Sequence, residues 1–530
     1  MIEPPIRVFH EILAYRATDT PDKTFLVTRA RSLTYAEAHA ISNTIAHSLI
    51  AAGVHRRDRV AVMMPNGIDF ILTWFGICKL GAIPVPFNEA YLGVMLQNQA
   101  VETGCRVAVL ESTYVERWVA IADGLPDLDR LFVHGAATSV VVPDAWAVEA
   151  WAVLADGDSS DLPSVVTHRD VMAILYTSGT TGPSKGVMYG YGHAYATARP
   201  LGLECEPDDV FYMFLSMFHT GLPHTLGTVL IAGCTMAIRE KFSRTQFWAD
   251  VAYFRATTTL IISTMSSYLL ANPPSPDDAM NTLEHVFMSP LPTDIDAFKQ
   301  RFGLARVATL FNLTEASTPL FSGFALANGS SCGRPRPGMQ VRLVDENDEE
   351  VPIGEPGELV LRSDEPWELG LGYWGNPEAT AASWRNQWMH TGDLLTRDAE
   401  GNFYFKDRLK DVIRRRGENV SAWELEMAVN RHPSITECAA VAVPSPMGDD
   451  EIKVVAVTSD TTQVGERELW LFLAGQLPAY MVPRYLRVQR QDLPKTSTGK
   501  IQKMDLRSDP IDGCWDAEAE GLVVSRAVSR

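Results

Sequence analysis

The chain has 530 residues, of which 46% are hydrophobic and 21% are charged. This length exceeds one ordinary domain, and the composition is typical of a globular protein with enough apolar material for large cores. The formal net charge of -19 argues against a nucleic-acid surface, because phosphate contacts need clustered lysine and arginine, whereas a small polyanion needs only a local cationic pocket.

The N-terminal part alternates helix and strand patterns. Thr34 and Glu37 form the pattern of a capping box, and apolar residues then recur at helical spacing until Gly53, a typical residue just past a helix end. Further helices are expected to end at Gly81 and near Gly104. Short apolar strands are expected between the helices, at residues 59–64, 83–86 and 107–110. This alternation predicts a layered α/β domain with a largely parallel sheet.

The segment 211–236 is apolar and long enough to suggest a membrane span. It contains His219, Pro223, His224 and three glycines, however, so we expect a buried strand–loop–strand segment and no transmembrane helix. The N-terminus lacks the pattern of a secretion signal. The seven cysteines are scattered and form no C-x-x-C pair, which favours reduced thiols in a cytoplasmic protein.

The α/β pattern returns between residues 201 and 320 and then changes. Strands at 341–344 and 357–361 flank an acidic turn, and 403–405 adds another, which indicates an antiparallel β unit. After residue 408 the chain becomes basic and alternates helix and strand again. We therefore expect two domains, residues 1–408 and a small α+β domain of residues 409–530, whose last twenty or so residues would be an appendage.

The strongest local signal is a loop rich in glycine and hydroxyl side chains directly after an apolar strand, 171–175. Its glycines let backbone N–H groups face phosphate oxygens, and Lys185 adds positive charge. It is not a Walker A loop, because Lys185 precedes a glycine instead of following one before Ser or Thr. The residues expected to contact phosphate are Thr177, Ser178, Gly179, Thr180, Thr181, Gly182 and Lys185.

This loop resembles the phosphate loop of the adenylate-forming superfamily, which contains acyl-CoA synthetases, adenylation domains of peptide synthetases and luciferases. Five further segments match that family in its order, within residues 10–505. They are Phe218–Gly221, Phe311–Glu315, Thr391–Asp393, Asp407–Asn419 and Pro494–Lys500. The resemblance is strongest to the crotonobetaine/carnitine-CoA ligase and fatty-acid-CoA ligase branches. It implies a large N-terminal domain that binds ATP and the acid, with a small mobile C-terminal lid.

The resemblance also implies an activity. ATP would activate a carboxylic acid as its AMP anhydride, and the acyl group would then pass to coenzyme A. Lys500 would bridge the acyl carboxylate and the α-phosphate, which needs cations aimed at developing charge. Glu315 would bind Mg²⁺, since a hard carboxylate oxygen suits this ion. His219 would lie near the acyl carboxylate.

The resemblance also implies which residues contact the nucleotide and the thiol. Phe311 would stack on adenine, where Tyr is more usual, and Asp393 would accept hydrogen bonds from the ribose hydroxyls. The other implied nucleotide contacts are Asn312, Thr314 and Arg408. Lys410 would be the hinge of the lid. The implied residues of the thiol channel are Arg414, Gly417, Glu418 and Asn419, and Arg415 and Arg416 are further candidates for phosphate contacts.

Some positions depart from the family pattern. Asn312 replaces the usual glycine, and Met288, Ser289 and Pro290 stand where the family has small residues. No aspartate stands near His219, where amino-acid adenylation domains use one to bind the substrate amine. That absence argues against an amino-acid substrate.

The acid is expected to be aliphatic and largely apolar, or a short carnitine-like acid, because the segments 211–226 and 310–322 that should wall its pocket are apolar. A quaternary ammonium would need an aromatic cage. The rings available for one are Phe211, Tyr212, Phe214 and Phe218.

Two alternatives remain open. One is an acyl-AMP ligase that loads a separate carrier protein, and the other is a nucleotide-binding pseudoenzyme, against which intact Lys185, Glu315, Asp393 and Lys500 argue. The expected partners are the acid, ATP and coenzyme A, without nucleic acid. The sequence leaves a homodimer open.

Overall fold

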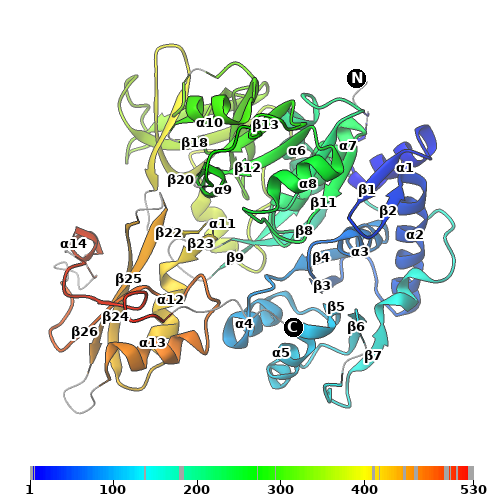
Figure 1. Cartoon of the computed structure of the whole chain (residues 1–530). Helices are drawn as coiled ribbons and strands as arrows, with labels where there is room; N and C mark the ends of the chain where they lie inside the picture. The colour runs from blue at the N-terminus through cyan, green and yellow to red at the C-terminus, as the bar shows by residue number, and fades with distance from the viewer. Residues whose placement is uncertain are drawn as a thin grey trace. The chain divides into compact units, whose positions relative to one another are not determined.

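The structure is a computed structural model that describes residues 4–522 except 5, 137–138, 178–183, 271, 293, 327, 409–411, 417, 446–448, 459–463, 495–500, 502 and 509–510. The chain divides into two compact units, whose long segments meet between Asp407 and Arg408. Two short segments, Ala90–Met95 and Thr177–Lys185, group with the C-terminal unit. Figure 1 shows the order of the elements. The mixed α/β class predicted from the sequence is confirmed.

The first unit is built around a nine-stranded sheet with the order β16-β15-β14-β13-β12-β10-β11-β1-β2. Its strands from β14 to β1 are mutually parallel, and β2, β15 and β16 pair antiparallel at the two edges. The strands are β1 (Thr24–Val27), β2 (Ser32–Thr34), β10 (Val210–Met213), β11 (Thr235–Ile238), β12 (Thr258–Ile262), β13 (His285–Ser289), β14 (Arg306–Leu313), β15 (Ser317–Phe321) and β16 (Arg334–Pro335).

A second sheet has five parallel strands in the order β4-β3-β5-β6-β7. They are β3 (Arg59–Met63), β4 (Ile83–Pro86), β5 (Val107–Glu111), β6 (Arg130–His134) and β7 (Ala147–Ala150). Strands β3 and β4 are buried almost throughout, as expected for a parallel sheet covered on both faces. Strands β8 (Val171–Thr177) and β9 (Lys185–Gly190) form a separate two-stranded sheet.

The antiparallel unit lies where the sequence predicts it. Its strands are β17 (Met339–Val344), β18 (Gly357–Ser363), β19 (Trp384–Arg385), β20 (Trp388–Arg397) and β21 (Phe403–Arg408). Side chains from this unit and from the end of β14 share one apolar core, which includes Leu313, Leu361 and Phe403. The ladder therefore packs directly beneath the turn that follows β14.

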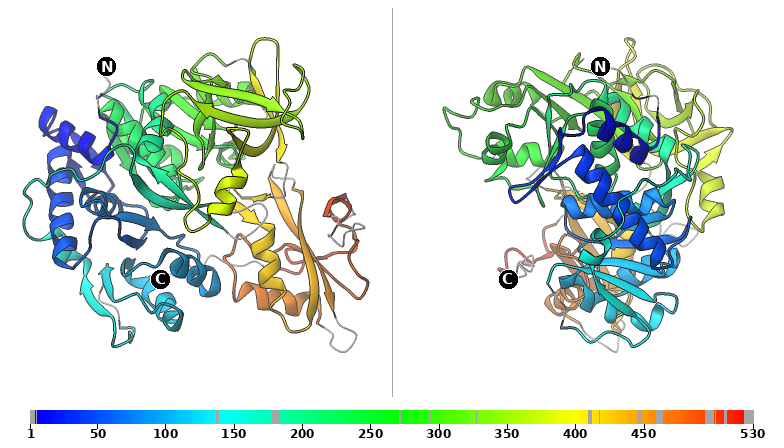
Figure 2. Two further views of the ribbon diagram at one scale, coloured as in Figure 1. Left: turned by 180° about the vertical axis from the view of Figure 1, so that it is seen from behind. Right: turned by 90° about the vertical axis from the view of Figure 1, so that its right-hand side faces the viewer.

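Most helices of the first unit cover its parallel sheets, while α11 (Pro377–Ser383) contacts β19 and β20 of the antiparallel unit. The other helices are α1 (Phe9–Asp19), α2 (Tyr35–Ala51), α3 (Ile68–Lys79), α4 (Gly93–Thr103), α5 (Val115–Val119), α6 (Tyr191–Gly202), α7 (Gly221–Ala232), α8 (Phe247–Phe254), α9 (Ser263–Leu270) and α10 (Ile295–Phe302). The predicted capping box is present, because Thr34 accepts from the Glu37 N–H and the Glu37 carboxylate accepts from the Thr34 N–H. Helices α1 and α2 pack together, as Figure 2 shows, and so do α6 and α7.

The C-terminal unit has its own core. Its four-stranded sheet has the order β24-β25-β26-β27, and a hairpin of β22 and β23 precedes it. The elements are β22 (Val412–Arg415), β23 (Glu418–Ser421), α12 (Ala422–Val429), β24 (Ile435–Pro444), β25 (Asp450–Thr458), α13 (Glu466–Ala474), β26 (Tyr485–Gln489), α14 (Lys503–Ser508) and β27 (Trp515–Asp516). Alternate residues of β24 and β25 face two different apolar clusters, so both faces of the sheet are covered.

Two sequence predictions need correction. The segment 211–236 contains helix α7 between β10 and β11, where a strand–loop–strand arrangement was expected. Every residue of α7 from Leu222 to Ala232 is buried, so the helix has no polar face that would reveal its period. Within the last twenty or so residues, expected to be an appendage, Trp515 and Asp516 form β27, which pairs with β26. In the described part of the chain, no helix is both long enough and apolar enough to span a membrane.

Candidate active site

Several of the predicted site residues follow the carboxyl ends of parallel strands in the nine-stranded sheet. The loop after β10 carries His219, β13 ends at Ser289, and β14 carries Phe311 and Asn312 towards Glu315. Strands β10, β12, β13 and β14 are parallel, so their carboxyl ends lie along one edge. Ligand sites of open α/β sheets form along this edge.

Glu315 lies in the tight turn between β14 and β15, and its side chain is half-buried. The Tyr373 hydroxyl donates a hydrogen bond to Oε1 of Glu315 at 3.0 Å. The Gly370 N–H donates to the backbone oxygen of Glu315 at 2.8 Å. A Cβ on residue 370 would come within 2.8 Å of that same oxygen, so glycine is needed for this close approach. Burial and the nearby Glu315 carboxylate raise the pKa of Tyr373, which keeps its hydroxyl a donor.

Helix α6 holds the other side of this turn. Ser317 has a φ of 57°, which few residues other than glycine adopt, and its N–H donates to Nε2 of His193 at 2.9 Å. Burial lowers the pKa of His193 to about 3, so the ring is neutral and Nε2 is free to accept. One residue on, the Thr318 hydroxyl donates to the backbone oxygen of Thr197 at 2.9 Å. Sequence reasoning missed His193, Gly370 and Tyr373, which fix the predicted Glu315.

Asp393 is placed by an irregularity in β20. Gly392 has a φ of 74° within the strand, where the pairing with β18 shifts by two residues. The Gly392 N–H donates to the Glu358 carboxylate at 3.0 Å, and the Asp393 N–H donates to the Thr391 hydroxyl at 3.1 Å. The Asp393 side chain is almost fully buried. Burial, with the Asp393 carboxylate nearby, raises the pKa of Cys332 to about 11.

The predicted adenine-side residues lie at the end of β14. The half-buried Phe311 ring lies 6.4 Å from that of Phe405. The Asn312 amide nitrogen donates to the Thr318 hydroxyl at 3.3 Å and lies 3.2 Å from Nδ1 of His224. Burial lowers the pKa of His224 to about 3. The two segments predicted to wall the acyl pocket therefore meet through this contact between Asn312 and His224. Thr314, two residues after Asn312, is buried.

Asn66 anchors the loop that carries His219 through two hydrogen bonds. Asn66 accepts from the Met217 N–H at 2.9 Å and donates to the Leu215 backbone oxygen at 2.8 Å. Nδ1 of His219 lies 2.9 Å from the Thr220 hydroxyl. Desolvation lowers the pKa of His219, so its ring is neutral near pH 7. The loop thus presents an uncharged imidazole at the carboxyl edge of the sheet.

The predicted aromatic cage does not form from the four rings. Residues 211 and 212 are adjacent in β10, so their side chains point to opposite faces of the sheet, and Phe211 and Tyr212 belong to different core clusters. The Tyr212 hydroxyl donates to Asp250 at 2.8 Å, deep in the core, and Phe214 packs against Tyr212. Phe218 alone of the four is half-exposed.

In the C-terminal unit, Arg414 and Glu418 lie on the β22–β23 hairpin, and the Arg414 side chain is exposed. Arg415, considered as a phosphate contact, is instead 4% exposed and forms a buried ion pair with Glu451. Other predicted residues lie outside the described part of the chain. These are Ser178, Gly179, Thr180, Thr181, Gly182, Lys410, Gly417 and Lys500, together with the side chains of Arg408 and Asn419. Thr177 ends β8, and Lys185 begins β9.

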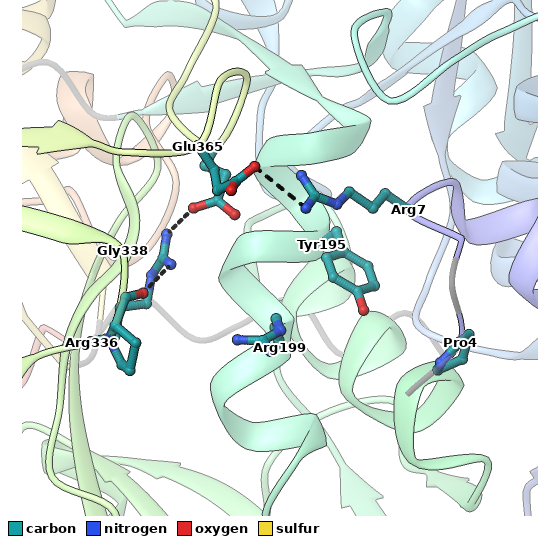
Figure 3. Close-up of a pocket in the computed structure, with 9 residues that line it drawn as sticks. Pro4, Arg7, Tyr195, Arg199, Arg336, Gly338 and Glu365 are labelled. Carbon is teal, nitrogen blue, oxygen red and sulfur yellow. Dashed lines mark hydrogen bonds and ion pairs between the residues drawn. The ribbon is translucent and has the colours of Figure 1, made fainter. Parts of the chain in front are cut away.

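A cavity of about 510 Å³ opens between α6 and the segment that leads to Gly370 (Figure 3). Its lining is mostly charged, with Pro4, Arg7, Tyr195, Arg199, Arg336, Pro337, Gly338, Glu365 and Glu368. Arg336 pairs with Glu368 at 2.8 Å and also donates to the Thr318 backbone oxygen at 3.1 Å. Among the described residues, none of the predicted site residues lines this cavity, but its buried ion pair supports β15 directly after the Glu315 turn.

Comparison with known proteins decides the family. A family model described as "AMP-binding enzyme" matches residues 13–374, and one described as "AMP-binding enzyme C-terminal domain" matches residues 424–500. The chain belongs to the AMP-binding enzyme family. The resemblance inferred from the motifs is thereby confirmed, and the fold around the candidate site is that of an AMP-binding enzyme.

Several proteins are similar to this chain over most of its length. A crotonobetaine/carnitine-CoA ligase of Citrobacter koseri is 31% identical over an alignment of 492 residues, which covers 90% of this chain and 93% of that protein. The solved structure of o-succinylbenzoate CoA synthetase (MenE) from Bacillus subtilis shares the fold with a TM-score of 0.81 at 21% identity, covering 94% of this chain and 98% of that one. ATP-bound MatB from Rhodopseudomonas palustris is 25% identical with a TM-score of 0.67, covering 94% and 98%.

Proposed function

We propose that this AMP-binding enzyme is an AMP-forming acyl-CoA synthetase. In the first step an oxygen of the acid's carboxylate attacks the α-phosphorus of ATP. The bond to the β-phosphate oxygen breaks, and pyrophosphate leaves with its electron pair. In the second step the sulfur of coenzyme A attacks the acyl carbonyl, AMP leaves with the carboxylate oxygen, and the thiol proton passes to solvent. The products are the acyl thioester, AMP and pyrophosphate.

The observation that supports this proposal most strongly is the fixed turn of Glu315 at the carboxyl edge of the parallel sheet, in a chain that matches both family models. Tyr373 and Gly370 donate hydrogen bonds to Glu315 on one side of that turn, and Ser317 donates to His193 of α6 on the other. Preorganised groups of this kind need no rearrangement when charge develops on the phosphates. A surface glutamate without a function would need no such support.

Glu315 also fits the magnesium ion that the family implies. Its carboxylate supplies the hard oxygen ligand that Mg²⁺ prefers, and one of its oxygens is oriented by the Tyr373 hydroxyl. The side chain is half-buried, which leaves room for the waters this ion retains. When bound, the ion would neutralise charge on the phosphate oxygens.

Other residues of the chain orient and shield the reactants. His219 is neutral, so it presents no cation that would hold the acid carboxylate away from the α-phosphorus. Phe311 offers its face to the adenine, and Lys185 and Lys500 supply positive charge to the phosphates and the attacking carboxylate. These four assignments are part of the proposal.

The acid that we propose is aliphatic and largely apolar, or a short carnitine-like acid. The relatives named as carnitine-CoA ligases favour a carnitine-like acid. The four rings considered for an ammonium cage point to different faces, however, so a quaternary ammonium would need other contacts. The polar pair Asn312–His224 offers a neutral hydrogen-bonding contact for a hydroxyl group on the acid.

An acid and acceptor panel tests the proposal. The full chain is supplied with ATP, magnesium and single acids, namely carnitine, crotonobetaine, straight-chain fatty acids and amino acids. Pyrophosphate is measured first, and AMP release is then measured with coenzyme A or with a carrier protein. We expect aliphatic acids to give pyrophosphate and coenzyme A to release AMP. Release by the carrier protein alone would support an acyl-AMP ligase, and activity on amino acids alone would contradict the proposed acid.

A further inference from the structure

Three buried side chains of different chemistry converge near the amino ends of β10 and β13. The Sγ atom of Cys205 lies 3.7 Å from Nε2 of His285, and this nitrogen lies 3.8 Å from Oδ2 of Asp209. One ligand atom of each residue lies within 4.8 Å of the other two. The three residues are 0%, 2% and 7% exposed respectively, so the cluster is closed to bulk water.

The cluster is separate from the candidate active site, because it lies at the opposite edge of the same sheet. Asp209 directly precedes β10, and His285 is the first residue of β13, while Cys205 follows the end of α6. Strands β10, β12 and β13 are parallel, so their amino ends share one edge. Their carboxyl ends, which lead to the His219 loop and to Ser289, share the other.

The Cys205–His285 contact is within reach of a weak hydrogen bond to sulfur, whereas the His285–Asp209 contact is too long for a hydrogen bond and close to the separation of two ligands of one ion. An N–H···O bond spans about 2.7–3.2 Å, and the imidazole–carboxylate separation of 3.8 Å exceeds it. With zinc bonds of about 2.0–2.3 Å in tetrahedral geometry, neighbouring ligand atoms lie about 3.3–3.6 Å apart. The two observed separations exceed that range by no more than a few tenths of an ångström.

The carboxylate is already oriented for such a role. Oδ1 of Asp209 accepts from the Thr257 hydroxyl at 2.6 Å, and Oδ2 accepts from the Glu206 N–H at 2.7 Å. Carboxylates that bind metals are held by hydrogen bonds of this kind, and each oxygen keeps a second lone pair. Among the described residues, the one ion-pair partner of this buried carboxylate is His285.

We propose that Cys205, Asp209 and His285 bind one zinc ion, with water in the fourth position. Sulfur, imidazole nitrogen and carboxylate oxygen are the three donor types that zinc accepts in proteins. Binding would release the thiol proton of Cys205 to solvent, and the thiolate and carboxylate would then balance the two charges of the ion. The ion and its ligands would then have no net charge, which suits a buried position. The ion would link the loop after α6 to two strands of the central sheet.

Metal analysis tests this proposal independently of the catalytic activity. The full chain without a tag is incubated with zinc chloride, dialysed, and analysed for zinc. We expect about one zinc per chain in the wild type and a clear loss in Cys205→Ser. Cys78→Ser is the matched control, because Cys78 is also a buried free cysteine but lies in α3, and it should retain the metal.

Cobalt(II) serves as a spectroscopic probe of the same site. Cobalt-loaded wild type should show thiolate-to-cobalt charge-transfer absorption that is absent from Cys205→Ser and weakened in His285→Gln. Should the variants fail to fold by circular dichroism, the wild-type spectrum still decides. Folded wild type that takes up no zinc overturns the proposal. Cobalt uptake without thiolate absorption also overturns it, because the metal would then be bound elsewhere.

Discussion

Tyr373 reaches Glu315 across 58 residues of sequence, and this one hydroxyl orients the carboxylate expected to bind magnesium. Tyr373→Phe removes the donor and leaves the ring. A hydrogen bond to a charged group contributes about 1.5–3 kcal/mol, so we expect acid-dependent pyrophosphate release to fall by about tenfold or more. The magnesium concentration for half-maximal rate should rise as well. Initial rates over a magnesium series measure both effects.

A matched control is Tyr404→Phe. The Tyr404 hydroxyl donates to the Asp398 carboxylate at 2.6 Å, so this change also removes a hydroxyl from a carboxylate, away from the Glu315 turn. Its rates should stay close to wild type at every magnesium concentration. Equal losses in the two variants, or an unchanged magnesium dependence in Tyr373→Phe, would show that the hydroxyl does not act through Glu315.

Lys500 carries a prediction that rests on the motif, because it lies outside the described residues. If its ammonium acts only while AMP is being attached, Lys500→Ala should slow pyrophosphate release by at least roughly 10²-fold. Thioester formation from synthetic acyl-AMP and coenzyme A should remain near the wild-type rate. The two assays are run on the same preparation, and an equal loss in both would contradict a role confined to the first step.

Single residues differ in how far the sequence could predict them. Glu315 and Asp393 stand in short motifs, so their position could be named from neighbouring letters. Their supports could not, because His193 lies 124 residues from Ser317 and carries no motif of its own. The bulge at Gly392 depends on pairing with β18, which local sequence does not specify. The predicted aromatic cage was wrong for a different reason. Its rings are close in sequence, but side chains alternate along a strand, so neighbouring rings point to opposite faces of the sheet.

At the scale of elements, His134 joins three pieces of the five-stranded sheet region. Its ring contacts Asp69 of α3 at 3.0 Å and Glu111 of β5 at 2.6 Å, and these hydrogen bonds raise the pKa of His134 from 6.5 to about 9. The folded state thus binds this proton more tightly than the unfolded state. The resulting stability is fully present below pH 6.5 and is lost as the pH rises towards about 9.

Thermal unfolding over a pH series checks this sign. The Tm of wild type should fall relative to that of His134→Gln between pH 6.5 and pH 9. His55→Gln is the control, because the His55 side chain is 78% exposed, and its Tm should run parallel to that of wild type. A constant difference between wild type and His134→Gln across this range would contradict the linkage.

Helices with a polar face or a marked end were predictable, and the helix that is buried on every side was not. Helix α2 has its capping box and a glycine at φ 85° just past its end, so its limits could be read from the sequence. Helix α7 is buried on every side, which removes the periodic signal. The parallel order of the sheets followed from alternating helices and strands, whereas the order of strands within them needed the structure.

At the scale of the whole molecule, the prediction concerns the boundary between the two units, which lies between Asp407 and Arg408. If Lys410 is a hinge, Lys410→Pro should impair thioester formation more than pyrophosphate release, because proline fixes φ and removes an N–H. Lys410→Ala removes the side chain but keeps the backbone freedom, so both steps should stay near wild type. Equal loss of the two steps in Lys410→Pro, or no loss, would exclude a hinge there.

The most direct test of the proposed function is acid-dependent exchange of labelled pyrophosphate into ATP, measured without coenzyme A. An acyl-AMP intermediate forms reversibly before any thiol is needed, so we expect label to enter ATP only when a suitable carboxylic acid is present. AMP should appear in step with thioester once coenzyme A is added. Exchange that is independent of acid, or formation of ADP with an acyl phosphate, would contradict an AMP-forming acyl-CoA synthetase.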